Sequence, residues 1–139
     1  MWGSQGAGDG QFNFLVHEDV TYTIGGIVLD KNNKVYVGDG LNSRIQVFDS
    51  RGNFLSKWGS VGAHDGQFLR VLDLAMDAQG DIYAVDDHSD DIQKFDPQGK
   101  FIIKFGQEGR GDGQLSNTGG ITIGPDGNLY IADYGNDRA

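Results

Sequence analysis

Short apolar runs alternate with turn-forming residues along this 139-residue sequence. Residues 25–30 are mainly apolar, 35–39 and 43–49 alternate apolar with polar positions, and 54–59 ends in Trp-Gly. Turn segments lie between these runs, at 30–34 (DKNNK) and 50–53 (SRGN). Alternation over five to seven residues, bounded by such turns, predicts four short β-strands.

The same succession recurs along the chain. It predicts strands at 71–77, 81–86, 91–96 and 101–106, and then at 119–124 and 128–133. The block WGSVGAHDGQ at 58–67 matches FGQEGRGDGQ at 105–114, 47 residues later, and WGSQGAGDGQ at 2–11 is a third copy. A period of this size indicates stacked supersecondary units. Helical repeats would need long glycine-free stretches with a 3.6-residue period, which this sequence lacks, so we expect four-stranded antiparallel β-propeller blades.

We therefore expect an all-β fold, a partial β-propeller of about two and a half blades. The first blade spans 2–59 with an insertion at 12–23, and the second spans 60–106. The third spans 107–139 and ends after its second strand. Because propellers close into rings, the missing blades are expected from the rest of the same chain.

These motifs resemble the NHL repeat. The resemblance rests on GDGQF (8–12), GIVLD (26–30), KVYVGD (34–39), NSRIQVFD (42–49) and FLSKWGS (54–60). The second unit departs from the pattern, because Ser89-Asp90-Asp91 stands where the repeat has Asn-x-Arg. The resemblance implies a ring of about six blades. It does not choose a function, because NHL propellers include RNA-binding domains, receptor sensor domains and a zinc-dependent lyase.

Charge narrows the choice of partner. Twenty acidic residues against eleven basic ones leave a net charge of −9, which disfavours nucleic acid because its binding depends on Lys and Arg. Sorting the charges by the predicted topology places the whole net charge on one end. That end holds the loops between second and third strands and the connections between blades. It would attract cations or a basic partner, unless it is simply a solvated rim. No apolar stretch is long enough to cross a membrane as a helix.

The densest acidic cluster is 86–91. Flexible loops rich in carboxylates suit Ca²⁺, so Asp86, Asp87 and Asp90 are candidate metal ligands, and His88 and Asp91 join them as candidate ligand-binding residues. The alternative is that Asp86 is simply the strand-end aspartate of the repeat and Asp91 stands at the position of its arginine.

The strand-end aspartates and the repeat arginines form another pattern. We expect Arg44 to pair with Asp39, and Arg138 with Asp133, as rim ion pairs of little energetic value if exposed. The aspartates of the Gly-Asp-Gly-Gln blocks are expected to bond their own turns. Those aspartates are Asp9, Asp65 and Asp112.

The insertion at 12–23 (FNFLVHEDVTYT) mixes aromatic, acidic and histidine side chains on the same end. Loops on a rigid scaffold often carry binding residues. Its candidate ligand-binding residues are Phe14, His17, Glu18, Asp19 and Tyr22. The insertion could equally be a strand or plug that packs against a neighbouring blade.

The sequence favours a binding or scaffold module for a protein or basic peptide, with no required cofactor. The alternative is a metal-dependent propeller enzyme, a lyase or hydrolase with its site in the central channel. Zn²⁺ would need about three converging ligands, which His17, His64 and His88 could supply only by meeting at one end. There is no G-x-S-x-G nucleophile motif.

Overall fold

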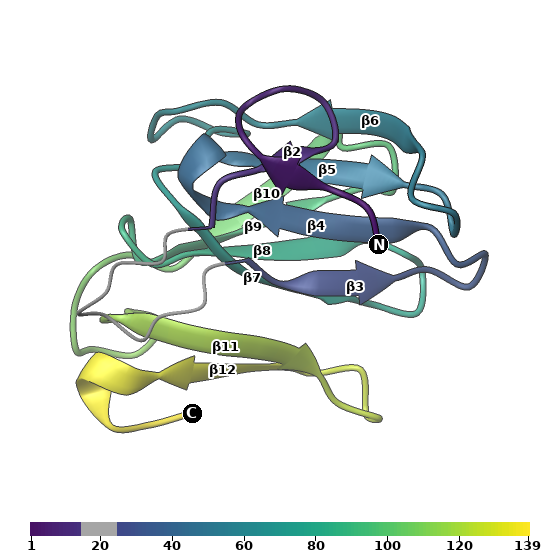
Figure 1. Cartoon of the computed structure of the whole chain (residues 1–139). Coiled ribbons are helices and arrows are strands. Elements are labelled where there is room, and N and C mark those ends of the chain that lie inside the picture. Colours follow the sequence, from purple (N-terminus) through teal and green to yellow (C-terminus); the bar gives the residue numbers. More distant parts are fainter. Residues whose placement is uncertain (15–24) are drawn as a thin grey trace.

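A computed structural model describes residues 1–14 and 25–139 of the chain, and it is built from β-sheets (Figure 1). The first blade contains β3 (Ile27–Leu29), β4 (Val35–Asp39), β5 (Arg44–Phe48) and β6 (Phe54–Trp58). The second contains β7 (Val71–Met76), β8 (Ile82–Asp86), β9 (Asp91–Phe95) and β10 (Phe101–Phe105). In both sheets, strands adjacent in sequence pair antiparallel. The predicted four-stranded antiparallel blades are confirmed.

The third sheet pairs β11 (Thr118–Ile123) with β12 (Leu129–Asp133). Two short 3-10 helices follow second strands, η1 (Gly40–Asn42) after β4 and η2 (Tyr134–Asn136) after β12. Near the N-terminus, β1 (Ser4–Gln5) and β2 (Gln11–Phe12) form a short parallel pair that the alternation pattern did not predict. Every predicted strand is present, and its ends differ from the prediction by at most two residues. No helix in the described part of the chain has the length and apolar character to span a membrane.

Two apolar clusters hold the sheets together. The larger lies between the first two blades and includes Tyr36, Ile45, Phe68, Val71 and Phe95. The smaller joins the second blade to β11 and β12 through Ala75, Val85, Ile92 and Ile121. These side chains occupy the apolar positions of strands that are covered on both faces, as in neighbouring blades.

An aromatic ring also joins the first blade to the second. The Trp58 ring at the end of β6 packs on Phe95 of the second blade, with ring centroids 5.8 Å apart. It also covers Gly99, where an added Cβ would lie 2.5 Å from the indole. Gly99 has φ of +86°, so both its conformation and the close ring require glycine. Trp2 covers Gly52 of the first blade in the same way.

The Gly-Asp-Gly-Gln turns differ from the prediction. The glutamine makes the bond within each turn: Gln11 Oε1 accepts from Gly8 N–H at 2.9 Å, and Gln114 Oε1 from Gly111 N–H at 2.8 Å. The turn aspartates point outward, and Asp9 instead pairs with Lys57. The glutamine side chain is one methylene group longer than that of aspartate, and it accepts the turn hydrogen bond that was predicted for the aspartate.

The three inner strands lie side by side, with β7 between β3 and β11 (Figure 1). Because the blades are antiparallel meanders, the loops after β4, β8 and β12 gather at the same end as the connections between blades. The candidate functional residues lie at this end.

Candidate functional site

A buried ion pair lies at the end of the first blade. The Asp39 side chain is fully buried, and its Oδ2 accepts from Arg44 Nε at 2.8 Å. Three further groups donate to the same carboxylate: the Asn13 N–H, the Asn42 amide and the Gln46 amide. The predicted pairing is confirmed, and the pair is buried, so the low energetic value of an exposed ion pair does not apply to it. The Asn13–Asp39 contact brings the connection between blades over the strand end and shields the pair from water.

The Arg44 guanidinium also binds the turn that precedes its own blade. Its Nη1 donates to the Ala7 carbonyl at 2.9 Å, and its Nη2 donates to the Gly8 and Gln11 carbonyls at 2.8 and 3.0 Å. A planar guanidinium with five donors can serve a carboxylate and several carbonyls at once. Arg44 therefore joins the Gly-Asp-Gly-Gln turn to the end of β4.

The third blade repeats this arrangement. Arg138 Nε donates to Asp133 Oδ2 at 2.7 Å, and its Nη atoms donate to turn carbonyls of Arg110, Gly111 and Gln114. Burial acts to raise the pKa of Asp133. Hydrogen bonds from the Asn136 amide, the Ser116 N–H and Arg138 outweigh that effect and hold the pKa below its ordinary value. The Arg138 side chain is 37% exposed, so this pair is wetter than the Asp39–Arg44 pair.

The second blade has an acid in place of the arginine. Asp86 pairs in register with Asp91, as Asp39 does with Arg44. Asp91 is only 6% exposed, and its Oδ1 has no hydrogen-bond partner. Lys104 is the nearest cation, with its Nζ 3.7 Å from Asp91 Oδ2 and 3.0 Å from the Ala63 carbonyl. Burial raises the pKa of Asp91, and the Asp86 charge adds to the rise, against the lowering effect of Ser89 and Lys104.

The residues of the predicted Ca²⁺ site have other partners. Asp86 accepts the backbone N–H groups of Leu69 and His88, at 2.6 and 3.0 Å, among others. Asp87 turns away and forms an ion pair with Arg70. Among residues 1–14 and 25–139, no group of three or more His, Cys, Asp or Glu side chains is placed so that it could hold a metal ion. The Ca²⁺ site stays a prediction without geometric support in the described residues.

Two other candidates in the cluster lie near Asp86. The His88 side chain is exposed, and its backbone rather than its ring contacts Asp86. Asp90 has a left-handed backbone with φ of +50°, and its Oδ1 is buried without a partner. Burial raises the pKa of Asp90, against hydrogen bonds from the Thr118 and Asn117 backbones.

Most of the insertion lies outside the described residues. The predicted ligand-binding residues His17, Glu18, Asp19 and Tyr22 belong to that part, so nothing is placed for them. Phe14, the remaining candidate, is 42% exposed. Its ring stacks on Phe12 with a centroid distance of 5.2 Å and an interplanar angle of 13°.

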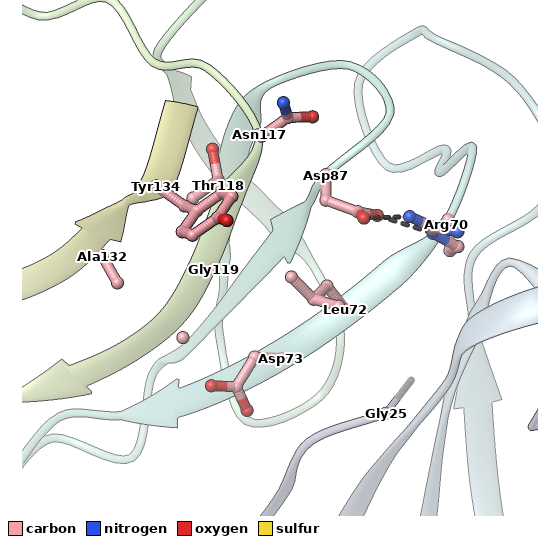
Figure 2. Close-up of a pocket in the computed structure, with 11 residues that line it drawn as sticks. Gly25, Arg70, Leu72, Asp73, Asp87, Asn117, Thr118, Gly119, Ala132 and Tyr134 are labelled. Carbon is pink, nitrogen blue, oxygen red and sulfur yellow. Dashed lines mark hydrogen bonds and ion pairs between the residues drawn. The ribbon is translucent and has the colours of Figure 1, made fainter. Parts of the chain in front are cut away.

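A cavity of about 830 Å³ opens at the inner ends of the second and third blades (Figure 2). Strands β7 and β11 form its walls, with the residues after β8 and β12 at its rim. Figure 2 shows the Arg70–Asp87 ion pair on one side of the cavity, Tyr134 on the other and Asp73 between the two strands. The Nε of Arg70 is 2.7 Å from Asp87 Oδ1.

Of the residues that line the cavity, only Asp87 is among the binding residues predicted from the sequence. The sequence does mark Asp73 as unusual, because the other two units have glycine at the equivalent positions, Gly26 and Gly120, 47 residues away on either side. Thr118 is marked less clearly, since the equivalent residue of the second blade is the fully buried Val71. The cavity itself needs two blades side by side, which strand patterns do not specify.

Solved structures with the same fold share little sequence with this chain. A streptogramin B lyase aligns with a TM-score of 0.62 at 16% identity, over 79% of this chain and 34% of that one. An exported protein from Bacteroides fragilis NCTC 9343 aligns with a TM-score of 0.63 at 20% identity, over 86% and 32%. The calcium-binding protein regucalcin from Agrobacterium tumefaciens aligns with a TM-score of 0.57 at 16% identity, over 79% and 38%. At these identities the likeness concerns the fold alone.

The chain spans about a third of the length of these structures. No curated protein matches the sequence. The model of one protein family, described as a 6-bladed beta-propeller, matches residues 17–97. That match covers more than half of the 139 residues and includes most of the first two blades. The chain therefore belongs to this family of 6-bladed beta-propellers.

Proposed function

We propose that this chain is part of an NHL-type propeller that acts as a binding module for a protein or basic peptide. The ligand is received at the end of the blades where the loops gather. The observation that carries the proposal is the cavity between the second and third blades, which opens at that end and has acidic side chains in its wall and rim. A concave site on a rigid scaffold is the usual place for ligand binding.

The distribution of acids supports a basic ligand. Asp39, Asp86 and Asp133 are buried and bonded inside the blades, so they add little to the charge that a ligand meets. The acids that remain exposed at this end belong mainly to the turns and loops between blades: Glu108, Asp112 and Asp137, together with Asp9 and Asp65, which have Lys57 and Lys104 as ion-pair partners. Such a surface raises the local concentration of cationic groups and speeds their association.

The NHL assignment rests on the residues of the repeat. In the first and third blades, the Asn and Arg side chains of the Asn-x-Arg segment donate hydrogen bonds to the strand-end aspartate. The family resemblance therefore coincides with the contacts that join each blade to its preceding turn.

Fluorescence anisotropy with labelled hexalysine, hexaarginine and hexaglutamate tests the proposal on the 139-residue chain. We expect both basic peptides to bind in the micromolar range and the acidic peptide not to bind. The affinity should fall as salt is raised above about 0.15 M, because exposed charges are screened. Equal binding of all three peptides, or of none, contradicts the proposed function.

A further inference from the structure

The side of the first blade that faces away from the second blade carries exposed apolar side chains. Ile27 of β3 is 61% exposed, and Leu29 on the same strand is also exposed. The residues at the position of Ile27 in the second and third blades, Leu74 and Ile121, are only 3% and 8% exposed. In both cases the preceding blade covers them, within the two apolar clusters. The first blade therefore leaves open the face that a preceding blade covers elsewhere in the molecule.

The third blade leaves open the other half of the same contact. Tyr130 of β12 is 48% exposed, whereas Tyr36, at the same position of the first blade, is 1% exposed. The second blade covers Tyr36, whose hydroxyl donates to the Pro97 carbonyl at 3.4 Å. Ala132, two residues after Tyr130, is exposed as well, while the equivalent Val85 of the second blade is fully buried. A following blade would bury this face.

The two open faces complement each other, because they are the two sides of one repeated contact. Between the first and second blades, Leu74 lies in one apolar cluster with Tyr36. The Trp58 ring joins the same cluster, with its centroid 6.2 Å from that of Tyr36. Trp2 stands at the position of Trp58 in the repeat, and it remains 42% exposed. The tyrosine that matches Trp2 is Tyr130 of a blade placed before it.

The number of blades determines how such a contact can close. The described structure has three inner strands, β3, β7 and β11 (Figure 1), and the family has six blades. Three blades of such a ring span half a circle. A head-to-tail contact between identical chains closes when its rotation fits a whole number of times into a full turn. Two copies related by a half turn therefore supply six inner strands, three from each copy.

We propose that two copies of this 139-residue chain associate head-to-tail, with Ile27 and Leu29 of each copy packed against Tyr130 of the other. In this dimer a second copy takes the place of the further blades expected from the sequence. Trp2 of one copy meets Tyr130 of the other, as in the contact within the first blade. Burial of the exposed apolar side chains stabilises the association. The contact lies on the sides of the blades, so it does not require a peptide ligand.

Sedimentation equilibrium over a range of protein concentrations tests the dimer. We expect the mass to approach twice that of the 15.1-kDa chain as the concentration rises. Ile27→Glu places a charge in the contact and should weaken the dimer by about tenfold or more. Ile103→Glu is the matched control, because Ile103 is 52% exposed on β10 of the second blade, away from both open faces. A monomer at every concentration overturns the proposal and leaves the open faces to further blades of a longer chain.

Tyr130→Ala alters the opposite face and should also weaken the dimer, and urea denaturation shows whether each variant is folded. A mixture of Ile27→Glu with Tyr130→Ala restores one contact between two unchanged faces and places both substitutions in the other. We therefore expect the mixture to form more dimer than either variant alone. The head-to-tail contact is refuted if the mixture gains nothing, or if Ile103→Glu weakens the dimer as much as Ile27→Glu.

Salt separates this association from the peptide binding proposed above. Each copy carries a net charge of −9, so the copies repel one another and added salt should strengthen the dimer. The same salt should weaken the binding of a basic peptide. A dimer without peptide binding, or peptide binding by a monomer, would refute one proposal and leave the other standing.

Discussion

The first and second blades have the same strands in the same register. They differ in the residue that faces the strand-end aspartate, which is basic in the first blade and acidic in the second. In the first blade, one arginine joins Asp39 to three carbonyls of the preceding turn. In the second, Asp91 takes the arginine position and faces Asp86. Backbone N–H groups replace the arginine as donors to Asp86, while Lys104 reaches one turn carbonyl, that of Ala63.

This difference shows that the blade does not depend on one particular ion pair. The sheet and its apolar contacts form in both cases, because Ile45 and Ile92 next to these positions are fully buried in either blade. The ion pair stabilises a strand end that is already formed. The second blade retains a buried, partly unbonded carboxylate and should therefore be the less stable at this end.

The largest expected effect tests the first blade. Arg44→Ala leaves Asp39 buried without its cation and frees three turn carbonyls, so we expect a loss of about 3 kcal/mol in the free energy of unfolding. Urea denaturation followed by tryptophan fluorescence measures it. A loss below about 1 kcal/mol would mean that the backbone and amide donors to Asp39 suffice, as they do for Asp86.

The reverse change tests the second blade. Asp91→Arg restores the residue of the repeat beside Asp86 and the carbonyls of the turn at 63–67. We expect a gain of about 1.5–3 kcal/mol in the free energy of unfolding, the value of hydrogen bonds to a charged group. The double variant with Lys104→Met separates the new contacts from repulsion between two cations. Destabilisation in both backgrounds would show that the second blade has no space for the guanidinium.

Arg138 provides a graded comparison within the same motif. Its contacts match those of Arg44, but its side chain is 37% exposed against 8% for Arg44. We expect Arg138→Ala to cost about 1 kcal/mol or less, because water screens the pair and can replace it. The same urea experiment measures it, and a loss equal to that of Arg44→Ala would show that burial is not the deciding factor.

The smallest effect concerns pH. Burial raises the pKa of Asp91 above its ordinary value, so the folded state disfavours the ionised form. The free energy of unfolding of the native chain, relative to that of the Asp91→Asn variant, should be highest near pH 4. It should fall as the pH rises through the raised pKa, because Asp91 must then ionise in the folded state. Urea midpoints of both proteins between pH 4 and 8 measure this. Asp86 and Lys104 face Asp91 in both proteins, so a difference independent of pH would contradict the raised pKa.

The repeat predicted the strands and blades well, because apolar periodicity and Asx turns are local. The Asp30 carboxylate accepts the N–H groups of Asn32 and Lys34, and this turn type recurs at Asp49, Asp77 and Asp96. The pairing of Arg44 with Asp39 also followed from spacing, since both flank one tight loop. Its burial did not, because that depends on the connection between blades, which lies over the strand end at Asn13.

The candidate site was less predictable for the same reason. The cluster at 86–91 looks like one acidic loop in the sequence, yet the fold bonds Asp86 to backbone N–H groups, pairs Asp87 with Arg70 and buries Asp91. Asp73 and Thr118 lie 45 residues apart in the sequence, on inner strands of two blades that line one cavity.

The sequence by itself determined the blade, the extent of its strands and the charge at each strand end, since these depend on residues within one 47-residue unit. Only the tertiary structure decided which of those charges are buried and which stay exposed to solvent. Burial is a property of two blades in contact, and the Asp73 carboxylate fits between its neighbours because Gly26 and Gly120, one in each neighbouring blade, leave room for it.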